Sequence, residues 1–251
     1  ALGIFGEAIK AELGISDTQL GILTGLVFVI FYSILGLPIG RLADRYSRKK
    51  LLAACLTLWS CMTAFSGLAS NFWQLMLARI GVGVGEAGLN PSTHSLLSDL
   101  YPPNKRAGAF AIYGAGPPLG VIAGALIGGW VANEMGWRAG MIAIALPGIA
   151  LGLLFLFTVR EPVRDRTGTT GPADDVPSLR SAVGVFLQDP LFLYVTAGMA
   201  MAAIGLYSIS TFTVPYLVRV HQLNLFQASS LFGMAYGIAG AVGAWGGGWL
   251  T

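Results

Sequence analysis

Seven apolar stretches of membrane-spanning length constrain the fold of this 251-residue chain more than any other feature. A helix needs about 20 residues to cross roughly 30 Å of hydrocarbon at 1.5 Å per residue, and an unpaired backbone cannot face lipid. Only 11% of the residues are charged, which is too few to cover a water-soluble globule. We therefore predict an all-α polytopic membrane protein. The stretches are residues 18–40, 51–69, 73–98, 107–132, 138–159, 191–217 and 227–251.

Other functional classes lack their sequence signals. The chain has no P-loop and no G-x-S-x-G motif, so neither an ATP-driven pump nor a hydrolase is supported. Its two histidines lie on separate segments and make no metal site. The formal charge of +3 is expected in the loops of a membrane protein and does not indicate nucleic-acid binding. We predict that the protein is not an enzyme and has no cofactor, no metal and no nucleic-acid partner.

The basic residues are distributed unevenly over the connections between the predicted helices. Eleven lie in alternate connections, which share one side of the membrane, and only three lie in the others. Because cytoplasmic loops carry the excess of lysine and arginine, we predict that the larger group is cytoplasmic. The larger group comprises Arg41, Arg45, Arg48, Lys49, Lys50, Lys105, Arg106, Arg160, Arg164, Arg166 and Arg180. The smaller group comprises Lys10, Arg138 and Arg219.

Two features divide the chain into parts. Residues 1–9 read as the end of a first helix whose start lies outside this sequence, and residues 160–190 contain a polar, Gly/Pro-rich linker. Within the linker, residues 178–188 could form a short helix at the membrane interface. We therefore predict an amino-terminal helical bundle over residues 1–159 and the start of a carboxy-terminal bundle over residues 191–251.

The connection after the first apolar stretch carries the most specific motif, GRLADRYSRKK from Gly40 to Lys50. Basic residues alone would satisfy the topology rule, but they do not explain Asp44 among five cations. The motif resembles the G-x-x-x-D-R-x-x-R-[KR] loop between helices two and three of the major facilitator superfamily, although that pattern has a glycine where this chain has Ser47. The resemblance implies a cytoplasmic latch against the carboxy-terminal bundle. The latch residues would be Gly40, Asp44, Arg45, Arg48 and Lys49.

The same resemblance implies the fold and the numbering of the helices. It implies a major facilitator type helical bundle, represented here by helices two to seven, the end of helix one, and part or all of helix eight. The linker at residues 160–190 would then separate the two bundles of the transporter.

The third apolar stretch, helix four in this numbering, carries two opposite charges and an amide on one face. Arg79 and Glu86 are seven residues apart, so they lie within about 20° of each other around a helix, and Asn90 follows one turn later. Each charge would cost roughly 2.5–3.5 kcal/mol inside the bilayer, so such residues usually face a water-filled cavity. An internal ion pair is the alternative, although the two Cα atoms would be about 10.5 Å apart. The other side carries small residues suited to close helix packing: Gly81, Gly85, Gly88 and Ser92.

Helix four also resembles a particular group within the superfamily. The run R-x-x-x-G-x-G-E-A from Arg79 to Ala87 is similar to helix four of spinster-like transporters, which move lysolipids and sphingoid lipids, several of them with proton coupling. The resemblance implies that Glu86 is the protonatable group. It implies that Arg79 modulates Glu86 or meets an anionic headgroup. We predict Glu86, Arg79 and Asn90 as the residues that handle protons and substrate.

The fourth apolar stretch has two adjacent prolines between glycines. Pro117 and Pro118 remove two backbone donors and should bend the helix, while Gly116 and Gly120 would permit close packing. The segment resembles in part the G-P-x-x-G element in helix five of many major facilitator exchangers. Close packing with a kink and a rocking hinge both remain open.

The combined features predict a secondary active transporter that is proton-coupled and moves an amphipathic lipid by alternating access. Its partners would be membrane lipids, a small amphipathic substrate and protons. A superfamily transporter of a sugar, an organic anion or a drug is one alternative, and a lipid-binding membrane receptor that moves nothing is another. The sequence does not decide the oligomeric state, nor does it distinguish a bacterial inner membrane from a eukaryotic membrane.

Overall fold

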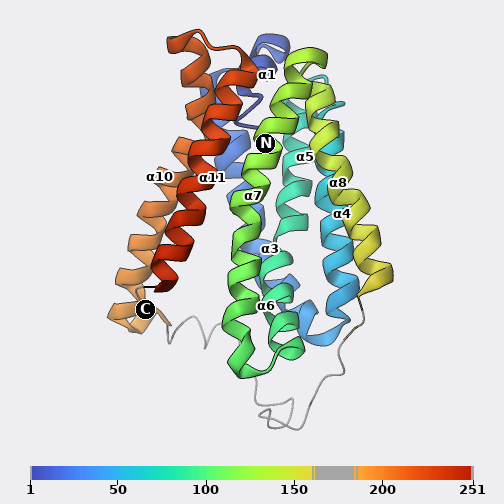
Figure 1. The fold of residues 1–251 in the computed structure, drawn as a ribbon, viewed down its shortest axis with the longest axis vertical. Helices are drawn as coiled ribbons and strands as arrows, with labels where there is room; N and C mark the ends of the chain where they lie inside the picture. Colours follow the sequence, from blue (N-terminus) through green and yellow to red (C-terminus); the bar gives the residue numbers. More distant parts are fainter. Residues whose placement is uncertain (1, 160, 162–183, 185, 250–251) are drawn as a thin grey trace. The chain divides into compact units, whose positions relative to one another are not determined.

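The computed structural model describes the backbone of residues 2–159, 161, 184 and 186–249, and over these residues every regular element is helical (Figure 1). Side chains are described over the same residues except 44–45 and 244–249. The chain forms two compact units, Ala1–Pro162 with Thr211–Thr251, and Val163–Ser210. All predicted site residues belong to the first unit. Most of the predicted linker at 160–190, with most of its interfacial helix, lies outside the described residues.

The helices follow the predicted apolar stretches closely. Within the described residues, five of them are long and apolar enough to cross a membrane: Asp17–Ala43, Pro103–Met135, Trp137–Thr158, Pro190–His221 and Leu225–Gly243. The elements in chain order are α1 Gly6–Leu13, α2 Asp17–Gly21, the π-helical turn η1 Ile22–Leu26, α3 Val27–Arg45, α4 Arg48–Ser66, α5 Phe72–Glu86, α6 Leu89–Leu100, α7 Pro103–Met135, α8 Trp137–Thr158, α10 Pro190–His221 and α11 Leu225–Trp249.

Short polar residues fix where several helices begin and end. Ser16 caps α2 in a capping box with Gln19, and Asn71 caps α5 by accepting from the backbone of Gln74. Helix α1 runs four residues beyond the predicted position 9. It ends at Gly14, whose φ of 64° lies in the left-handed region that favours glycine.

Helix four is two helices rather than one continuous rod over 73–98. Helix α5 ends at Glu86 and α6 begins at Leu89. Pro91 accounts for the break, because a proline inside a helix removes one backbone hydrogen bond and clashes with the carbonyl four residues earlier. That carbonyl belongs to Ala87, which lies in the break. Pro91 itself occupies the first turn of α6, where its missing N–H costs little.

The predicted small-residue face of helix four packs against α4, as expected. A Cβ added at Gly85 would lie 2.8 Å from the Trp59 backbone nitrogen, and one at Gly88 would lie 2.6 Å from the Cys55 sulfur. Only glycine therefore permits this approach of α5 to α4. Helix α4 also packs along α8, and α11 packs along α7 (Figure 1).

Candidate functional site

Arg79 and Glu86 are both half-buried on α5, where they act on each other electrostatically. The Arg79 guanidinium lies over the ring of Phe28 in α3, with 5.5 Å between its Cζ and the ring centroid. With the described part of the chain, the Glu86 carboxylate forms no hydrogen bond and no ion pair. Over these residues Glu86 is therefore not held in a direct ion pair, and its role in proton exchange stays a prediction.

Asn90 joins three helices through its side-chain amide. Its Nδ2 donates to the hydroxyl of Tyr32 in α3 at 3.0 Å, and the hydroxyl of Tyr113 in α7 donates to its Oδ1 at 2.8 Å. The Tyr32 ring stacks on Phe28 at 5.6 Å between centroids. A continuous polar and aromatic string therefore runs from Arg79 through Phe28, Tyr32 and Asn90 to Tyr113.

Sequence reasoning found Asn90 but missed Tyr32 and Tyr113. A tyrosine in an apolar stretch is equally consistent with an anchor at the membrane interface, so neither residue stood out. His94, although exposed, lies edge-on to the Tyr113 ring with 5.7 Å between ring centroids, and its ring centroid lies 5.1 Å from that of Phe110. These contacts hold the Tyr113 ring in place beside Asn90.

Two of the predicted latch residues, Arg48 and Gly40, lie against α6. Arg48 forms an ion pair with Asp99 near the end of α6, and its Nη1 donates to the Ser95 carbonyl at 3.2 Å. At Gly40, an added Cβ would lie 3.7 Å from Pro91. The side chains of Asp44 and Arg45 lie outside the described residues. A partner for the latch in the carboxy-terminal bundle therefore stays a prediction.

Glu161, which follows α8, caps the amino terminus of α4. Its carboxylate accepts from the Ser47 hydroxyl and from the backbone nitrogens of Arg48 at 2.8 Å and Lys49 at 3.1 Å. Partial burial raises the pKa of this carboxyl, but these donors outweigh it and hold the pKa below its ordinary value. The contact ties the start of the linker to the motif at residues 40–50.

Replacing Glu161 with glutamine should lower the stability of the protein by about 0.5–1 kcal/mol at pH 7, the usual contribution of a helix cap. Because the pKa is lowered in the folded state, the stabilisation is present above the ordinary glutamate pKa of 4.5 and is lost as the pH falls below it. Thermal unfolding in detergent at pH 7 and pH 4 measures both effects. Glu134→Gln is the control, because within the described part of the chain this exposed carboxylate accepts a hydrogen bond only from neighbouring Asn133. An equal loss for both variants would contradict the cap.

The segment with the two adjacent prolines, Gly116 to Gly120, lies within one uninterrupted helix, α7. Pro117 and Pro118 both lie inside it. Within the described part of the chain, no atom of another residue lies within 4 Å of a Cβ added at Gly116 or Gly120. Pro118 nevertheless packs against α11, since a Cβ added at Gly237 would lie 3.0 Å from its carbonyl oxygen, and further close contacts of α7 are made by Ala125 and Gly128. The hinge role of the segment stays a prediction.

The family model of the Major Facilitator Superfamily matches residues 1–251. The chain belongs to the major facilitator superfamily. This membership confirms the predicted fold class, and the family is one of transporters rather than enzymes.

Individual relatives place the chain near the spinster group of this superfamily. It is 34% identical over 242 residues to an MFS-type efflux pump of Mycolicibacterium smegmatis, covering 96% of this chain and 55% of that protein. It is 35% identical over 165 residues to a probable L-galactonate transporter of Escherichia coli, covering 65% of this chain and 36% of that protein. It is 29% identical over 222 residues to protein spinster homolog 1 of Xenopus tropicalis, covering 86% of this chain and 41% of that protein.

A solved structure supports the same placement. The crystal structure of a bacterial homolog of the human lysosomal transporter Spinster, in an inward-facing and unoccupied conformation, matches with a TM-score of 0.79 and 32% identity. The match covers 98% of this chain and 56% of that one. The predicted likeness to spinster transporters is thereby confirmed. The chain spans about half the length of the major facilitator relatives that it matches along most of its own length.

Proposed function

We propose that the complete protein is a proton-coupled secondary transporter that moves an amphipathic lipid of the lysolipid or sphingoid type by alternating access. The observation that carries the proposal is the string from Arg79 to Tyr113, which sets one cation and several hydrogen-bonding groups within otherwise apolar helices. The similarity to the sphingosine-1-phosphate transporter SPNS2 of Danio rerio, which is 28% identical over 167 residues, supports a lipid substrate. The uneven distribution of basic residues supports a cytoplasmic position for the loop at residues 40–50.

In this mechanism Glu86 carries the proton, and the string from Arg79 to Tyr113 orients the headgroup of the lipid. A carboxylate without a hydrogen-bonding partner gains and loses a proton as its access alternates between the two sides of the membrane. Asn90 has a second amide N–H, and Tyr32 has a hydroxyl proton, that can donate to headgroup oxygens. Arg79 supplies positive charge for an anionic headgroup. The two bundles, residues 1–159 and 191 onward, would rock around this site.

A transporter of a sugar acid is the second candidate. The similarity to the probable L-galactonate transporter favours it, and so does the hydrogen-bonding capacity of the Tyr32–Asn90–Tyr113 group. Sugars are recognised mainly through hydroxyl groups, whereas a lipid needs one polar patch beside a long apolar surface.

Flux measurements with the full-length protein in proteoliposomes test the proposal. We expect a fluorescent lysophospholipid to cross about tenfold faster than in protein-free vesicles when a pH gradient is applied, and we expect no competition by L-galactonate. Uptake of L-galactonate without lysophospholipid movement would establish the second candidate instead. Saturable lysophospholipid binding without flux would indicate a receptor.

Replacing Tyr113 with phenylalanine should raise the KM for the transported substrate about fivefold, with little change in maximal rate. The change removes the donor that orients Asn90, and one hydrogen bond contributes about 1 kcal/mol. Tyr101→Phe, an exposed tyrosine at the end of α6, is the matched control. Identical KM values for the two variants would show that the hydrogen bond from Tyr113 to Asn90 plays no part in substrate recognition.

A further inference from the structure

His94 lies one helical turn after Asn90 on α6, and both side chains are exposed. Residues four apart lie on the same face of a helix. The hydroxyl of Tyr113 in α7 donates to Asn90 Oδ1 at 2.8 Å, and the His94 ring lies edge-on to the ring of the same tyrosine. His94 therefore stands beside the Tyr113 end of the string that starts at Arg79.

The imidazole of His94 contacts the protein through aromatic rings alone. Its neighbours are the rings of Phe110 and Tyr113, with 5.1 and 5.7 Å between centroids. Within the described part of the chain, neither of its ring nitrogens forms a hydrogen bond or an ion pair. Both nitrogens can therefore serve a ligand, and a protonated imidazole offers a donor at each of them.

Positive charge is scarce along helix four, where Arg79 and His94 are the only basic residues between positions 73 and 98. Arg79 is eleven residues before Asn90, which is about 16 Å along the helix at 1.5 Å per residue. His94 is only four residues after Asn90, which is about 6 Å on the same scale. An anion that accepts from the second amide N–H of Asn90 therefore lies closer to His94 than to Arg79.

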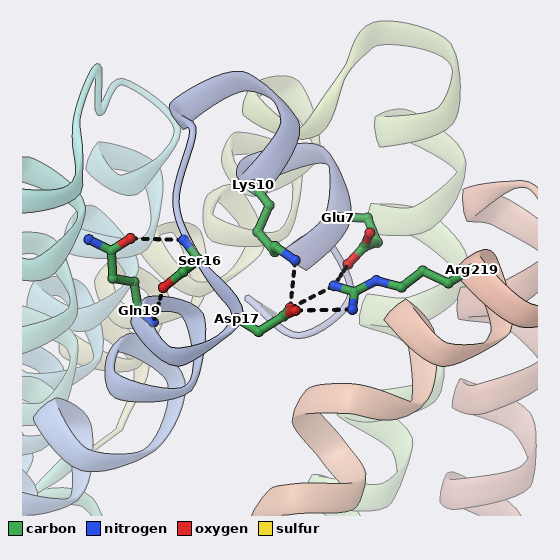
Figure 2. Close-up of polar contacts among 6 residues, drawn as sticks. All are labelled: Glu7, Lys10, Ser16, Asp17, Gln19 and Arg219. Atoms are coloured by element: carbon green, nitrogen blue, oxygen red, sulfur yellow. Dashed lines mark hydrogen bonds and ion pairs between the residues drawn. The ribbon is translucent and has the colours of Figure 1, made fainter.

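Several other cations of the described helices are already balanced by carboxylates. Figure 2 shows the group at one end of the helices, where Arg219 pairs with Glu7 and Asp17, and Lys10 also pairs with Asp17. The remaining pairs of this kind are Arg138 with Glu12 and Arg48 with Asp99. Because these four charges are neutralised, we do not expect them to attract a further anion.

The ionisable groups around His94 come from four helices, since α6 packs against α3, α4, α5 and α7. On α6 itself the only other charged residue is Asp99, which Arg48 neutralises. Glu86 on α5 is the nearest acidic residue before His94 in the sequence, so its own titration has to be separated from that of His94. The other ionisable residues of these helices are Tyr32, Arg41, Asp44 and Arg45 on α3, Arg48, Lys49, Lys50, Cys55 and Cys61 on α4, Arg79 on α5, and Lys105, Arg106, Tyr113 and Glu134 on α7.

We propose that protonated His94, together with Asn90, binds the anionic headgroup of the substrate, so that anionic lysolipids bind more tightly at acidic pH. This role rests on the proposed function, because it takes the Asn90 end of the string as the headgroup site. A histidine side chain is ordinarily half-protonated near pH 6.5, so its charge is mostly present at pH 5.5 and mostly absent at pH 7.5. Binding of an anion therefore strengthens as the pH falls.

Binding of lysophosphatidylglycerol to the full-length protein in detergent, measured at pH 5.5 and pH 7.5, tests this role. The phosphodiester of this lipid keeps one negative charge at both pH values, so the ligand itself does not titrate. The parent protein carries Glu86→Gln, because protonation of Glu86 would also favour an anion at low pH. We expect a dissociation constant about five- to tenfold lower at pH 5.5 than at pH 7.5. For zwitterionic lysophosphatidylcholine the two values should differ less than twofold.

Substitutions of His94 separate a binding role from a role in packing. His94→Gln should bind lysophosphatidylglycerol at both pH values as weakly as the parent does at pH 7.5. His94→Lys should bind tightly at both, because its charge persists, and packing alone would not produce that result. His221→Gln is the matched control, since His221 is the only other histidine, is exposed and lies edge-on to Tyr216 with 5.5 Å between ring centroids. Thermal unfolding verifies that each variant is folded.

A pH difference that survives in His94→Gln, or one that His221→Gln removes, would overturn the role of His94. L-galactonate, which is also an anion, separates this result from the lipid proposal. If lysophosphatidylglycerol does not bind but L-galactonate binds with a pH difference that depends on His94, the role of His94 stands and the lipid proposal fails. If lysophosphatidylglycerol binds without any dependence on His94, the lipid proposal stands and the role of His94 fails. Binding of neither anion would overturn both.

Discussion

Proton-driven uptake is expected to fall at least tenfold when Glu86 is replaced with glutamine, while the protein remains folded. Glutamine keeps the size of the side chain and its hydrogen-bonding capacity, but it cannot carry a proton at any physiological pH. Glu86 forms no hydrogen bond with the described part of the chain, so the substitution breaks no such contact. The defect should therefore appear in coupling rather than in stability.

Uptake assays with and without a pH gradient measure this effect directly. The variant should lose the stimulation by the gradient and keep any passive exchange of substrate. Glu134→Gln, at the end of α7, serves as the control and should behave as the unmodified protein. Gradient-stimulated uptake at the original rate would remove Glu86 from proton coupling.

Replacing Gly85 with leucine is expected to destabilise the folded protein by about 3 kcal/mol, toward the upper end of the usual cost of overpacking. A Cβ at this position would lie 2.8 Å from the Trp59 backbone nitrogen and 3.0 Å from the Cys55 carbonyl oxygen. Backbone atoms cannot move aside as the end of a flexible side chain can. Helices α4 and α5 would have to separate, and Arg79 and Glu86 would move with α5.

The yield of monodisperse protein and its unfolding temperature in detergent report this effect. Gly108→Leu on α7 is the matched control, since no other residue in the described part of the chain would lie within 4 Å of its Cβ. It should leave stability unchanged or raise it, because leucine is the better helix former. Equal stability of the two variants would show that α4 and α5 can separate without cost.

The arrangement of helices was largely predictable because the membrane imposes strong local rules. Apolar length locates the spans, and the recurrence of Gly81, Gly85 and Gly88 correctly indicates the face of helix four that packs closely. The break in helix four was missed although Pro91 is visible in the sequence. The apolar length of residues 73–98 predicts one continuous helix. Pro91 alone does not indicate a break, because prolines also occur within uninterrupted membrane helices such as α7.

The polar contacts were less predictable because they join residues far apart in the sequence. Arg79, Glu86 and Asn90 were found from spacing within a single helix. Their neighbours lie on other helices: Phe28, Tyr32 and Tyr113. Spacing along one helix cannot reveal them without a three-dimensional arrangement.

The same limit applies to ion pairs at the two ends of the helices. Arg48 and Arg219 were both recognised as loop charges that report topology. Their partners include Asp99, 51 residues from Arg48, and Glu7, 212 residues from Arg219. A charge near a helix end is usually solvated, so only the folded arrangement shows which of them are paired.

The pH inside proteoliposomes during lysophospholipid transport tests the central claim most directly. With the full-length protein and a trapped pH-sensitive dye, adding lysophospholipid outside should produce a saturable change in internal pH, and Glu86→Gln should abolish that change while protein-free vesicles show none. Lysophospholipid flux with no accompanying pH change, or an unaltered pH change in Glu86→Gln, would contradict a carrier that couples lipid movement to a proton on Glu86.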